Sequence, residues 1–275
     1  MGPNGSGKTT LASIIAGVKM PSSGIVEIYG QKPTEAKSLI SYVPQENFSS
    51  PRLSGRENLK YFTTLLGYSG DQRTRLVDEI LKRVGLSEEA DKQVAKYSGG
   101  MRKRLEVATA LFPGIKVLIL DEPTTGLDPA ARRGFFSMVR GIVDNKTTIL
   151  LITHIGSDAE LESRMGLIDD GKIVAEGTPD ELKRKYATED AITVETAEMT
   201  DSAFSILKGF SVSRNVAQVS SGYKIYVQNG DTVLAEVIRT LSQAGHTVLR
   251  VEMTRPTLED VFFRLTEKSM QEATL

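Results

Sequence analysis

The sequence predicts an α/β protein with a mostly parallel sheet, followed by a smaller α+β domain. Residues 117–120 and 149–152 are apolar runs without alternation, which is typical of strands buried on both faces of a parallel sheet. Segments with helical periodicity separate the strands, and an alternation of strands and helices favours parallel pairing. The chain has 275 residues, of which 40% are apolar, so it is long enough for two hydrophobic cores.

The composition excludes several kinds of protein. The chain contains no cysteine, which excludes disulfides and cysteine-ligated metals. Its net charge of −1 provides no general basic surface for nucleic acid. The apolar runs are far shorter than the roughly 20 residues of a membrane-spanning helix, and no apolar signal segment opens the sequence. We therefore expect a cytoplasmic protein that does not bind nucleic acid.

A phosphate-binding loop opens the chain at residues 2–9, where the sequence GPNGSGKT fits the pattern G-x-x-x-x-G-K-[ST]. The glycines let backbone N–H groups surround phosphates, while Lys8 supplies a cation and Thr9 a magnesium ligand. Apolar residues at helical spacing predict the following helix at residues 8–18. Only Met1 precedes the loop, where a buried strand is usual, so we expect a truncated or mis-started N-terminus.

Two short strands and a helical insertion are predicted next. Residues 24–30 and 39–43 have strand-like apolar patterns, and Gln45 follows the second of them. The S-x-x-E pattern at Ser54 is a capping box that starts one helix, and helical spacing predicts a second at residues 71–84. A further helix opens at Ser98-Gly99-Gly100, where free N–H groups and the helix dipole attract anions.

Charged and polar residues follow the buried strands. Asp121 and Glu122 come directly after the strand at residues 117–120, and His154 follows a strand at residues 148–153. A helix at residues 129–143 is predicted between these strands. Because ligands collect at the carboxyl ends of parallel strands, these side chains are candidates for a binding site.

Each motif has a simpler interpretation by itself. An acidic pair before a proline, such as Asp121 and Glu122, is also typical of a helix cap. A lone histidine such as His154 is more often a structural or surface residue. Gln45 alone is typical of a polar loop residue. The sequence Ser98-Gly99-Gly100 alone is typical of a helix cap and a turn. The ordered occurrence of all five motifs is what favours a functional interpretation.

Over residues 2 to about 185, this set of motifs resembles the nucleotide-binding subunits of ABC transporters. The matching segments are Lys8 and Thr9 in the Walker A motif, Gln45 in the Q-loop, Tyr97-Ser98-Gly99-Gly100-Met101 in the signature, Asp121-Glu122 in Walker B, Leu127-Asp128 in the D-loop and His154 in the H-loop. The implied fold is a P-loop NTPase of the ABC type.

The resemblance implies that the chain hydrolyses ATP with Mg²⁺. Glu122 would activate the attacking water, His154 would hydrogen-bond the γ-phosphate, and Gln45 would complete the metal and water shell. The implied metal ligands are Thr9, Gln45 and Asp121. The implied nucleotide-binding residues are Gly2, Pro3, Asn4, Gly5, Ser6, Gly7, Lys8, Thr9, Thr10, Gln45, Ser98, Gly99, Gly100, Asp128 and His154.

The resemblance also implies a homodimer that serves a membrane protein. Two copies would pack head to tail, with Ser98 and the N–H groups of Gly99 and Gly100 on the partner's γ-phosphate and Asp128 at the same interface. We expect this dimer to power export through polytopic permease subunits on the inner face of the cell membrane. The alternatives are a soluble ABC ATPase of translation or DNA repair, which the lack of a long coiled coil disfavours, and a non-hydrolysing binding protein, which Glu122 disfavours. The family's adenine-stacking aromatic residue has no counterpart before Gly2, so we expect weak ATP binding by this chain.

The remainder of the chain predicts a ferredoxin-like accessory domain. A hairpin turn at Asp170-Gly171 and a capping box at Thr178 complete an ATPase domain at residues 1–186, with a helical subdomain at about 50–110 and its first strands missing. Residues 187–275 follow a β-α-β-β-α-β order. Met101 in the signature and residues 255–262 are similar to those of drug and antibiotic exporters. We expect the accessory domain to be a regulatory or dimer-supporting module rather than a ligand sensor.

Overall fold

The computed structural model describes residues 1–142, 147–187, 189–212, 216–219 and 222–266. The chain forms two compact units. One unit comprises Gly7–His154, and the other combines Met1–Ser6 with Ile155–Leu275. The predicted helix 129–143 and the predicted turn at 220–222 lie partly outside the described residues.

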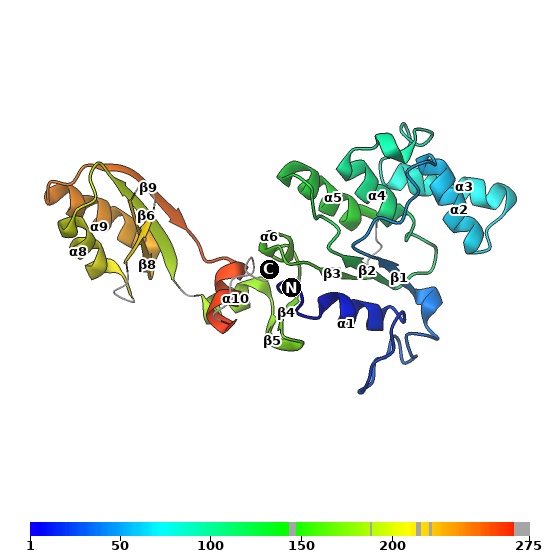
Figure 1. Cartoon of the computed structure of the whole chain (residues 1–275), viewed down its shortest axis with the longest axis horizontal. Helices are drawn as coiled ribbons and strands as arrows, with labels where there is room; N and C mark the ends of the chain where they lie inside the picture. Colours follow the sequence, from blue (N-terminus) through cyan, green and yellow to red (C-terminus); the bar gives the residue numbers. More distant parts are fainter. Residues whose placement is uncertain (143–146, 188, 213–215, 220–221, 267–275) are drawn as a thin grey trace. The chain divides into compact units, whose positions relative to one another are not determined.

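A three-stranded parallel sheet with the order β1-β2-β3 forms the centre of the unit Gly7–His154 (Figure 1). Its strands are β1 (Ile40–Val43), β2 (Val117–Asp121) and β3 (Thr148–Ile152). Every residue of β2 is buried, as its unbroken apolar pattern predicts. Leu118 and Leu120 belong to one hydrophobic cluster and Val117 and Ile119 to another, so β2 is covered on both faces.

Helix α1 (Lys8–Ile15) supplies Ala12 to the cluster on one face of this sheet, and the remaining helices cover the other face (Figure 1). Those helices are α2 (Gly55–Leu65), α3 (Gly70–Arg83), α4 (Gly99–Ala108) and α5 (Pro129–Ile142). The predicted capping box of α2 is present, since Ser54 accepts from the Glu57 N–H and Glu57 accepts from the Ser54 N–H. The helical insertion therefore begins where the sequence predicts.

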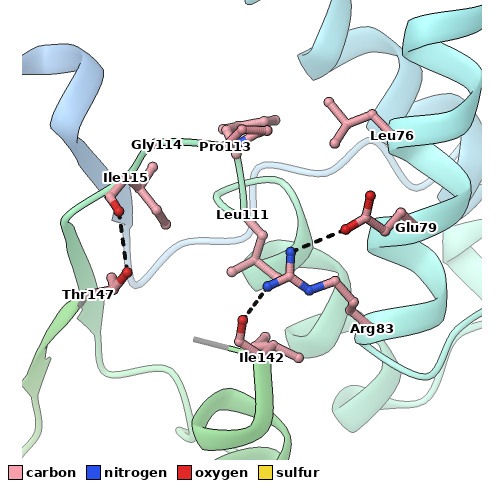
Figure 2. Close-up of a pocket in the computed structure, with 10 residues that line it drawn as sticks. Leu76, Glu79, Arg83, Leu111, Pro113, Gly114, Ile115, Ile142 and Thr147 are labelled. Carbon is pink, nitrogen blue, oxygen red and sulfur yellow. Dashed lines mark hydrogen bonds and ion pairs between the residues drawn. The ribbon is translucent and has the colours of Figure 1, made fainter. Parts of the chain in front are cut away.

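Arg83 joins α3 to the end of α5 across a pocket of about 240 Å³ (Figure 2). Its guanidinium donates to the carbonyl of Ile142 and lies 3.8 Å from the Glu79 carboxylate. A cation at the C-terminus of a helix complements its dipole and its unpaired carbonyls. None of the motif residues lines this pocket, so we interpret it as part of the packing between the two helices.

The strand predicted at residues 24–30 is not formed. Only an isolated bridge between Ile28 and Gln31 is present, Tyr29 has a φ of 51°, and Ile25 is exposed. Among the described residues no strand pairs with this segment, and an unpaired strand leaves its N–H and C=O groups without partners. The apolar pattern was therefore insufficient evidence for a strand.

The other unit contains a hairpin of β4 (Met165–Asp169) and β5 (Lys172–Gly177), joined by Asp170 and Gly171 with φ values of 46° and 76°. Both φ values suit the two-residue hairpin turn that the sequence predicts. Met1 lies beside β4: its amino group donates to the Gly166 carbonyl, and its carbonyl accepts from the Ile168 N–H. This pattern is that of a residue paired in parallel with a strand.

Three helices share a hydrophobic core with this hairpin: α6 (Gly156–Ala159), α7 (Pro179–Tyr186) and α10 (Leu258–Thr266). The capping box of α7 is present as predicted, with Pro179 at the first helical position. Leu258, Val261 and Phe262 of α10 are fully buried in this core, although they lie near the end of the chain.

The predicted β-α-β-β-α-β order is confirmed in the same unit. The elements are β6 (Asp190–Thr196), α8 (Asp201–Phe210), β7 (Val216–Val219), β8 (Gly222–Val227), α9 (Gly230–Gln243) and β9 (Val248–Thr254). The sheet is antiparallel with the order β7-β8-β6-β9, and α8 and α9 pack against it (Figure 1). Each βαβ half therefore has a strand of the other half between its own two strands, as in a ferredoxin-like fold.

None of the described helices is both long enough and apolar enough to span a membrane.

Candidate active site

Two acidic residues stand at the carboxyl end of β2 in different backbone conformations. Asp121 is the last residue of the strand and is fully buried. Glu122 donates its N–H to the Ile152 carbonyl and then turns the chain with a φ of 47°. A positive φ is uncommon for a residue with a side chain, and such strain of about 1 to 3 kcal/mol is concentrated at functional sites. The turn directs the two carboxylates to different neighbours.

The carboxylate of Glu122 is the meeting point of three motif residues. Lys8 Nζ lies 3.9 Å from its Oε1, and Gln45 Nε2 donates to its Oε2 at 3.1 Å. His154 Nδ1 lies 3.1 Å from Oε1 without the alignment of a hydrogen bond. The chain thus brings together residues from a helix start, a loop after β1 and the end of β3, as expected for the carboxyl edge of a parallel sheet.

Asp121 has the surroundings of a cation ligand. Burial raises its pKa, while hydrogen bonds from the Thr9 and Tyr42 hydroxyls oppose the rise. The Tyr42 hydroxyl donates to Oδ2 at 3.1 Å, whereas Oδ1 is buried and has no hydrogen-bond partner among the described residues. A buried carboxylate oxygen of this kind needs a partner, and a hard cation such as Mg²⁺ is a suitable one.

The residues present fit a magnesium ion that arrives with a phosphate ligand. In the described part of the chain, no group of three or more histidine, cysteine or acidic side chains is placed to hold a metal alone. Mg²⁺ is commonly bound by one or two protein ligands together with substrate phosphates. The Asp121 carboxylate and the Thr9 hydroxyl are a donor set of that type.

Lys8 is buried beside both acidic residues. Its pKa is lowered by burial, and the negative charges of Glu122 and Asp121 oppose this lowering. A buried ammonium that is held by acidic neighbours is well suited to exchange them for a phosphate, because a phosphate supplies equivalent charge.

The loop before Lys8 crosses the division between the two units. Gly5 and Gly7 have φ values of 79° and 98°, which glycine adopts without strain. A side chain at Gly2 would lie 2.2 Å from the Ile168 carbonyl. Of the remaining predicted residues, Pro3 accepts a hydrogen bond from the Ser6 N–H, whereas Asn4 and Thr10 are exposed.

The signature and D-loop residues come together in another pocket of the unit Gly7–His154. This pocket has a volume of about 330 Å³ and is lined by Ser98, Gly99, Gly100, Met101, Arg104, Gly126, Leu127, Asp128 and Ala131. Ser98 caps α4 by accepting from the Met101 N–H. Asp128 accepts from the N–H groups of Ala130 and Ala131, and these bonds lower its pKa. Its carboxylate therefore starts α5 as well as lining the pocket.

Sequence reasoning missed several residues that support this site. The Tyr42 hydroxyl holds Asp121, and the Thr125 hydroxyl donates to Glu122 at 3.4 Å. On α4, Lys103 donates to the Gln45 carbonyl, and Glu106 accepts from Ser49, four residues after Gln45. The sequence signal for Glu106 is that it is the only acidic residue in the stretch 105–111, where Thr109 is the only other polar residue.

Comparisons with known proteins identify the family of this chain. The family model described as "ABC transporter" matches residues 1–125. The daunorubicin resistance ATP-binding protein DrrA3 of Streptomyces coeruleorubidus is 36% identical over 97% of this chain and 85% of its own length. This chain belongs to the ABC transporter ATP-binding proteins.

Three further matches extend this assignment. The Nod factor export ATP-binding protein I of Burkholderia orbicola is 34% identical, over 99% of this chain and 88% of its own length. A dimeric post-hydrolysis structure of an ATP-binding cassette, bound to ADP and inorganic phosphate, is 27% identical with a TM-score of 0.58, over 65% of this chain and 83% of that one. Residues 177–266 match the C-terminal domain of DrrA1-3-like ATP-binding proteins. The ABC ATP-binding chain is therefore an ATPase of the exporter-like branch, and its fold is the predicted ABC-type P-loop fold with a ferredoxin-like domain.

Proposed function

We propose that this ATPase drives an exporter as a homodimer that holds ATP and Mg²⁺ between two copies. The observation that carries the proposal is the convergence of Lys8, Gln45 and His154 on the carboxylate of Glu122. A general base must lie within hydrogen-bond reach of the water that it deprotonates, and the Gln45 amide and the His154 ring beside Glu122 are groups that can orient this water. Mg²⁺ bound at Asp121 and Thr9 would neutralise phosphate charge.

The proposed chemistry distributes the roles among these residues. Lys8 binds the β- and γ-phosphates, and Glu122 accepts a proton from the water that attacks the γ-phosphorus. The bond from the γ-phosphorus to the bridging oxygen breaks, and ADP leaves with that oxygen. The His154 ring stabilises charge on the γ-phosphate oxygens, and Gln45 orients the water. Because phosphoryl transfer depends mainly on positioning and electrostatics, a preassembled cluster of this kind can supply most of the catalysis.

The pocket at Ser98–Asp128 supports the dimer. It presents the Ser98 hydroxyl and the glycine-rich start of α4 at a surface, where the helix dipole and the N–H groups of the first turn favour an anion. In the proposed dimer the anion is the γ-phosphate that the partner's loop holds. The relative whose structure is a dimer with ADP and inorganic phosphate supports this arrangement.

An exposed apolar patch on α2 supports attachment to a permease. Tyr61, Leu65 and Leu66 are all more than half exposed; the first two lie on α2, and Leu66 is the residue that caps its C-terminus. Grouped exposed apolar side chains are typical of a surface that a partner covers. We propose that this patch binds a polytopic membrane protein, which places the dimer at the inner face of the membrane. The names of the drug-resistance and Nod-factor relatives favour an exporter over a factor of translation or DNA repair.

Replacing the proposed base tests the whole assignment. The Glu122→Gln chain should lose ATP turnover by at least about a hundredfold, since general base catalysis contributes roughly 10² to 10⁴. It should nevertheless bind ATP and remain dimeric, as measured by sedimentation with Mg-ATP. Isolated from membranes in detergent with ATP, it should bring down a polytopic membrane protein.

Glu88→Gln, at an exposed acidic residue of the same unit, is the matched control and should keep wild-type turnover. Unchanged turnover in Glu122→Gln would remove Glu122 from its role. A chain that stays monomeric when saturated with Mg-ATP would contradict the dimer, and recovery with ribosomes alone would favour the translation alternative.

A further inference from the structure

Glu106 on α4 is a buried carboxylate for which the proposed chemistry has no use. Glu106 is 1% exposed, and Arg102 Nε lies 4.0 Å from its Oε1. Burying a carboxylate is unfavourable unless hydrogen bonds replace its water. The partners that replace the water are therefore informative about what Glu106 does.

The hydrogen-bond donors to Glu106 come from the segment that follows Gln45. The Ser49 hydroxyl donates to Oε1 at 2.6 Å, and the Ser49 N–H donates to the same oxygen at 3.3 Å. The Phe48 N–H donates to Oε2 at 3.4 Å. Both carboxylate oxygens of Glu106 thus bind residues that lie only three or four positions after Gln45.

A second side chain of α4 binds the same segment. Lys103 lies one turn before Glu106, and its ammonium donates to the Gln45 carbonyl at 3.4 Å. Burial lowers the pKa of Lys103, and the charge of Glu106 opposes this. Residues at this spacing lie on one face of a helix, so α4 presents a cation and an anion together to the segment 45–49.

The segment is also fastened on its other side. The Asn58 side chain of α2 accepts from the Ser50 N–H at 2.8 Å and donates to the Ser50 carbonyl at 3.1 Å. Residues 45–50 are therefore held by α4 at one end and by α2 at the other. The helix α4 begins at Gly99 with Ser98 as its cap, so the same rigid element carries the signature.

We propose that Glu106 is a positioning residue that fixes the Gln45 segment to the signature helix. This inference rests on the proposed function, and it deepens that function by naming the contact through which Gln45 and Ser98 keep a fixed relation during turnover. Because Ser98 and Glu106 lie on the same helix, a movement of the signature also moves Glu106. Glu106 binds Phe48 and Ser49, so this movement changes the position of the Gln45 amide beside Glu122. The hydrogen bonds are charge-assisted and buried, which makes this connection stiffer than a surface contact.

The test measures whether Glu106 acts through Gln45. In Glu106→Gln, one carboxylate oxygen becomes an N–H₂ group that cannot accept from the backbone, and kcat should fall about tenfold or more, because a small misplacement of a catalytic group is costly. The dissociation constant for ATP, measured by equilibrium binding, should change less than threefold. In a Gln45→Ala background the same substitution should lower kcat by less than twofold, since the group that it positions is gone.

A second measurement is independent of turnover. Hydrogen exchange of the Phe48 or the Ser49 amide should accelerate in Glu106→Gln more than exchange of amides elsewhere in the chain, because the N–H that faces the new N–H₂ group loses its acceptor. Ser49→Ala, which removes only the hydroxyl, should reduce kcat in the same direction and covers the case in which Glu106→Gln does not fold. Glu88→Gln should change neither quantity.

Equal losses of kcat with and without Gln45 would overturn the inference, as would unchanged exchange at Phe48 and Ser49. A wild-type chain that fails to hydrolyse ATP would contradict the proposed function instead, and the exchange measurement would still decide whether Glu106 holds the segment.

Discussion

Asp121 and Glu122 are neighbours in the chain, yet their surroundings suit them to different chemical roles. Asp121 is enclosed by hydroxyl donors and leaves one oxygen without a hydrogen-bond partner among the described residues, which suits a cation. Glu122 is turned by its positive φ toward amide, imidazole and ammonium groups, which suits proton transfer. Two carboxylates with separate environments can therefore serve as metal ligand and base in one site.

The titration of Asp121 predicts how the stability of the folded chain depends on pH. Burial raises its pKa above the ordinary value of 3.8, so the folded chain binds this proton more tightly than the unfolded chain. Stability linked to Asp121 must therefore fall as pH rises through the interval from 3.8 to the raised pKa. We expect the melting temperature of wild type minus that of Asp121→Asn to decrease by a few degrees across this interval and then to level off.

Calorimetry of both chains at closely spaced pH values, without nucleotide, measures this difference. Asp121→Asn should also lose magnesium-dependent turnover at every pH. A difference that grows with rising pH would show that the surroundings stabilise the ionised form of Asp121 instead.

At this scale the sequence predicts residue types at motif positions but not the contacts that support them. Lys8, Gln45 and His154 were predictable because their order and chemistry are constrained. The partner that allows Glu106 to be buried was not predictable, since Ser49 lies 57 residues away. The Glu259 carboxylate that accepts from the Gly156 N–H, 103 residues away, was equally hidden. Local patterns do not encode such long-range contacts.

Elements were predictable where two independent signals coincided. Helix α2 combines a capping box with apolar residues at helical spacing, and helix α7 combines a capping box with Pro179 at its first position; both begin where the sequence predicts. The segment at residues 24–30 had an apolar pattern alone, and its N–H and C=O groups depend on a neighbouring strand that no local pattern supplies. Strand β8, in contrast, is formed, and it pairs with a strand on each side, β7 and β6.

Gly222 at the start of β8 gives a prediction at the scale of this element. A Cβ atom there would lie 2.0 Å from the Val194 carbonyl oxygen and 2.9 Å from the Glu195 Cα, both in the backbone of the neighbouring strand β6. Backbone in the centre of a sheet cannot move aside cheaply, so Gly222→Ala should cost about 1 to 3 kcal/mol of unfolding free energy. Urea denaturation followed by circular dichroism measures the change.

Gly209→Ala is the matched control in the same unit. Gly209 lies in α8, and nothing approaches its missing Cβ within 4 Å, so alanine should be neutral or should stabilise by up to about 1 kcal/mol. Equal effects of the two substitutions would contradict the close approach of β8 to β6.

For the whole molecule, the boundary near residue 186 stays a prediction. The last described helix, α10, packs with α7, α6 and the β4–β5 hairpin, which precede that boundary, whereas α8 and α9 share a core with the ferredoxin-like sheet. The chain therefore returns to the segment before residue 186 after completing the accessory fold. Such a return contact over a long chain distance cannot be predicted from local sequence.

The proposed dimer predicts complementation between two inactive chains. Lys8→Ala removes the phosphate-binding cation but keeps the signature, whereas Ser98→Arg blocks the signature pocket but keeps Lys8. In a head-to-tail dimer each site takes Lys8 from one copy and Ser98 from the other. A mixed dimer of the two variants would therefore contain one site with both residues intact and one with neither.

Equal amounts of the two variants should regain up to about a quarter of wild-type turnover, because half of the two-fold dimers are mixed and each has one competent site of two. Each variant alone should stay inactive, and mixing wild type with an equal amount of Glu88→Gln controls for the mixing itself. If the site instead belonged to a single copy, both variants would be defective within their own chain and mixing could restore nothing. Recovery of turnover on mixing therefore separates a site shared between copies from one completed within a copy.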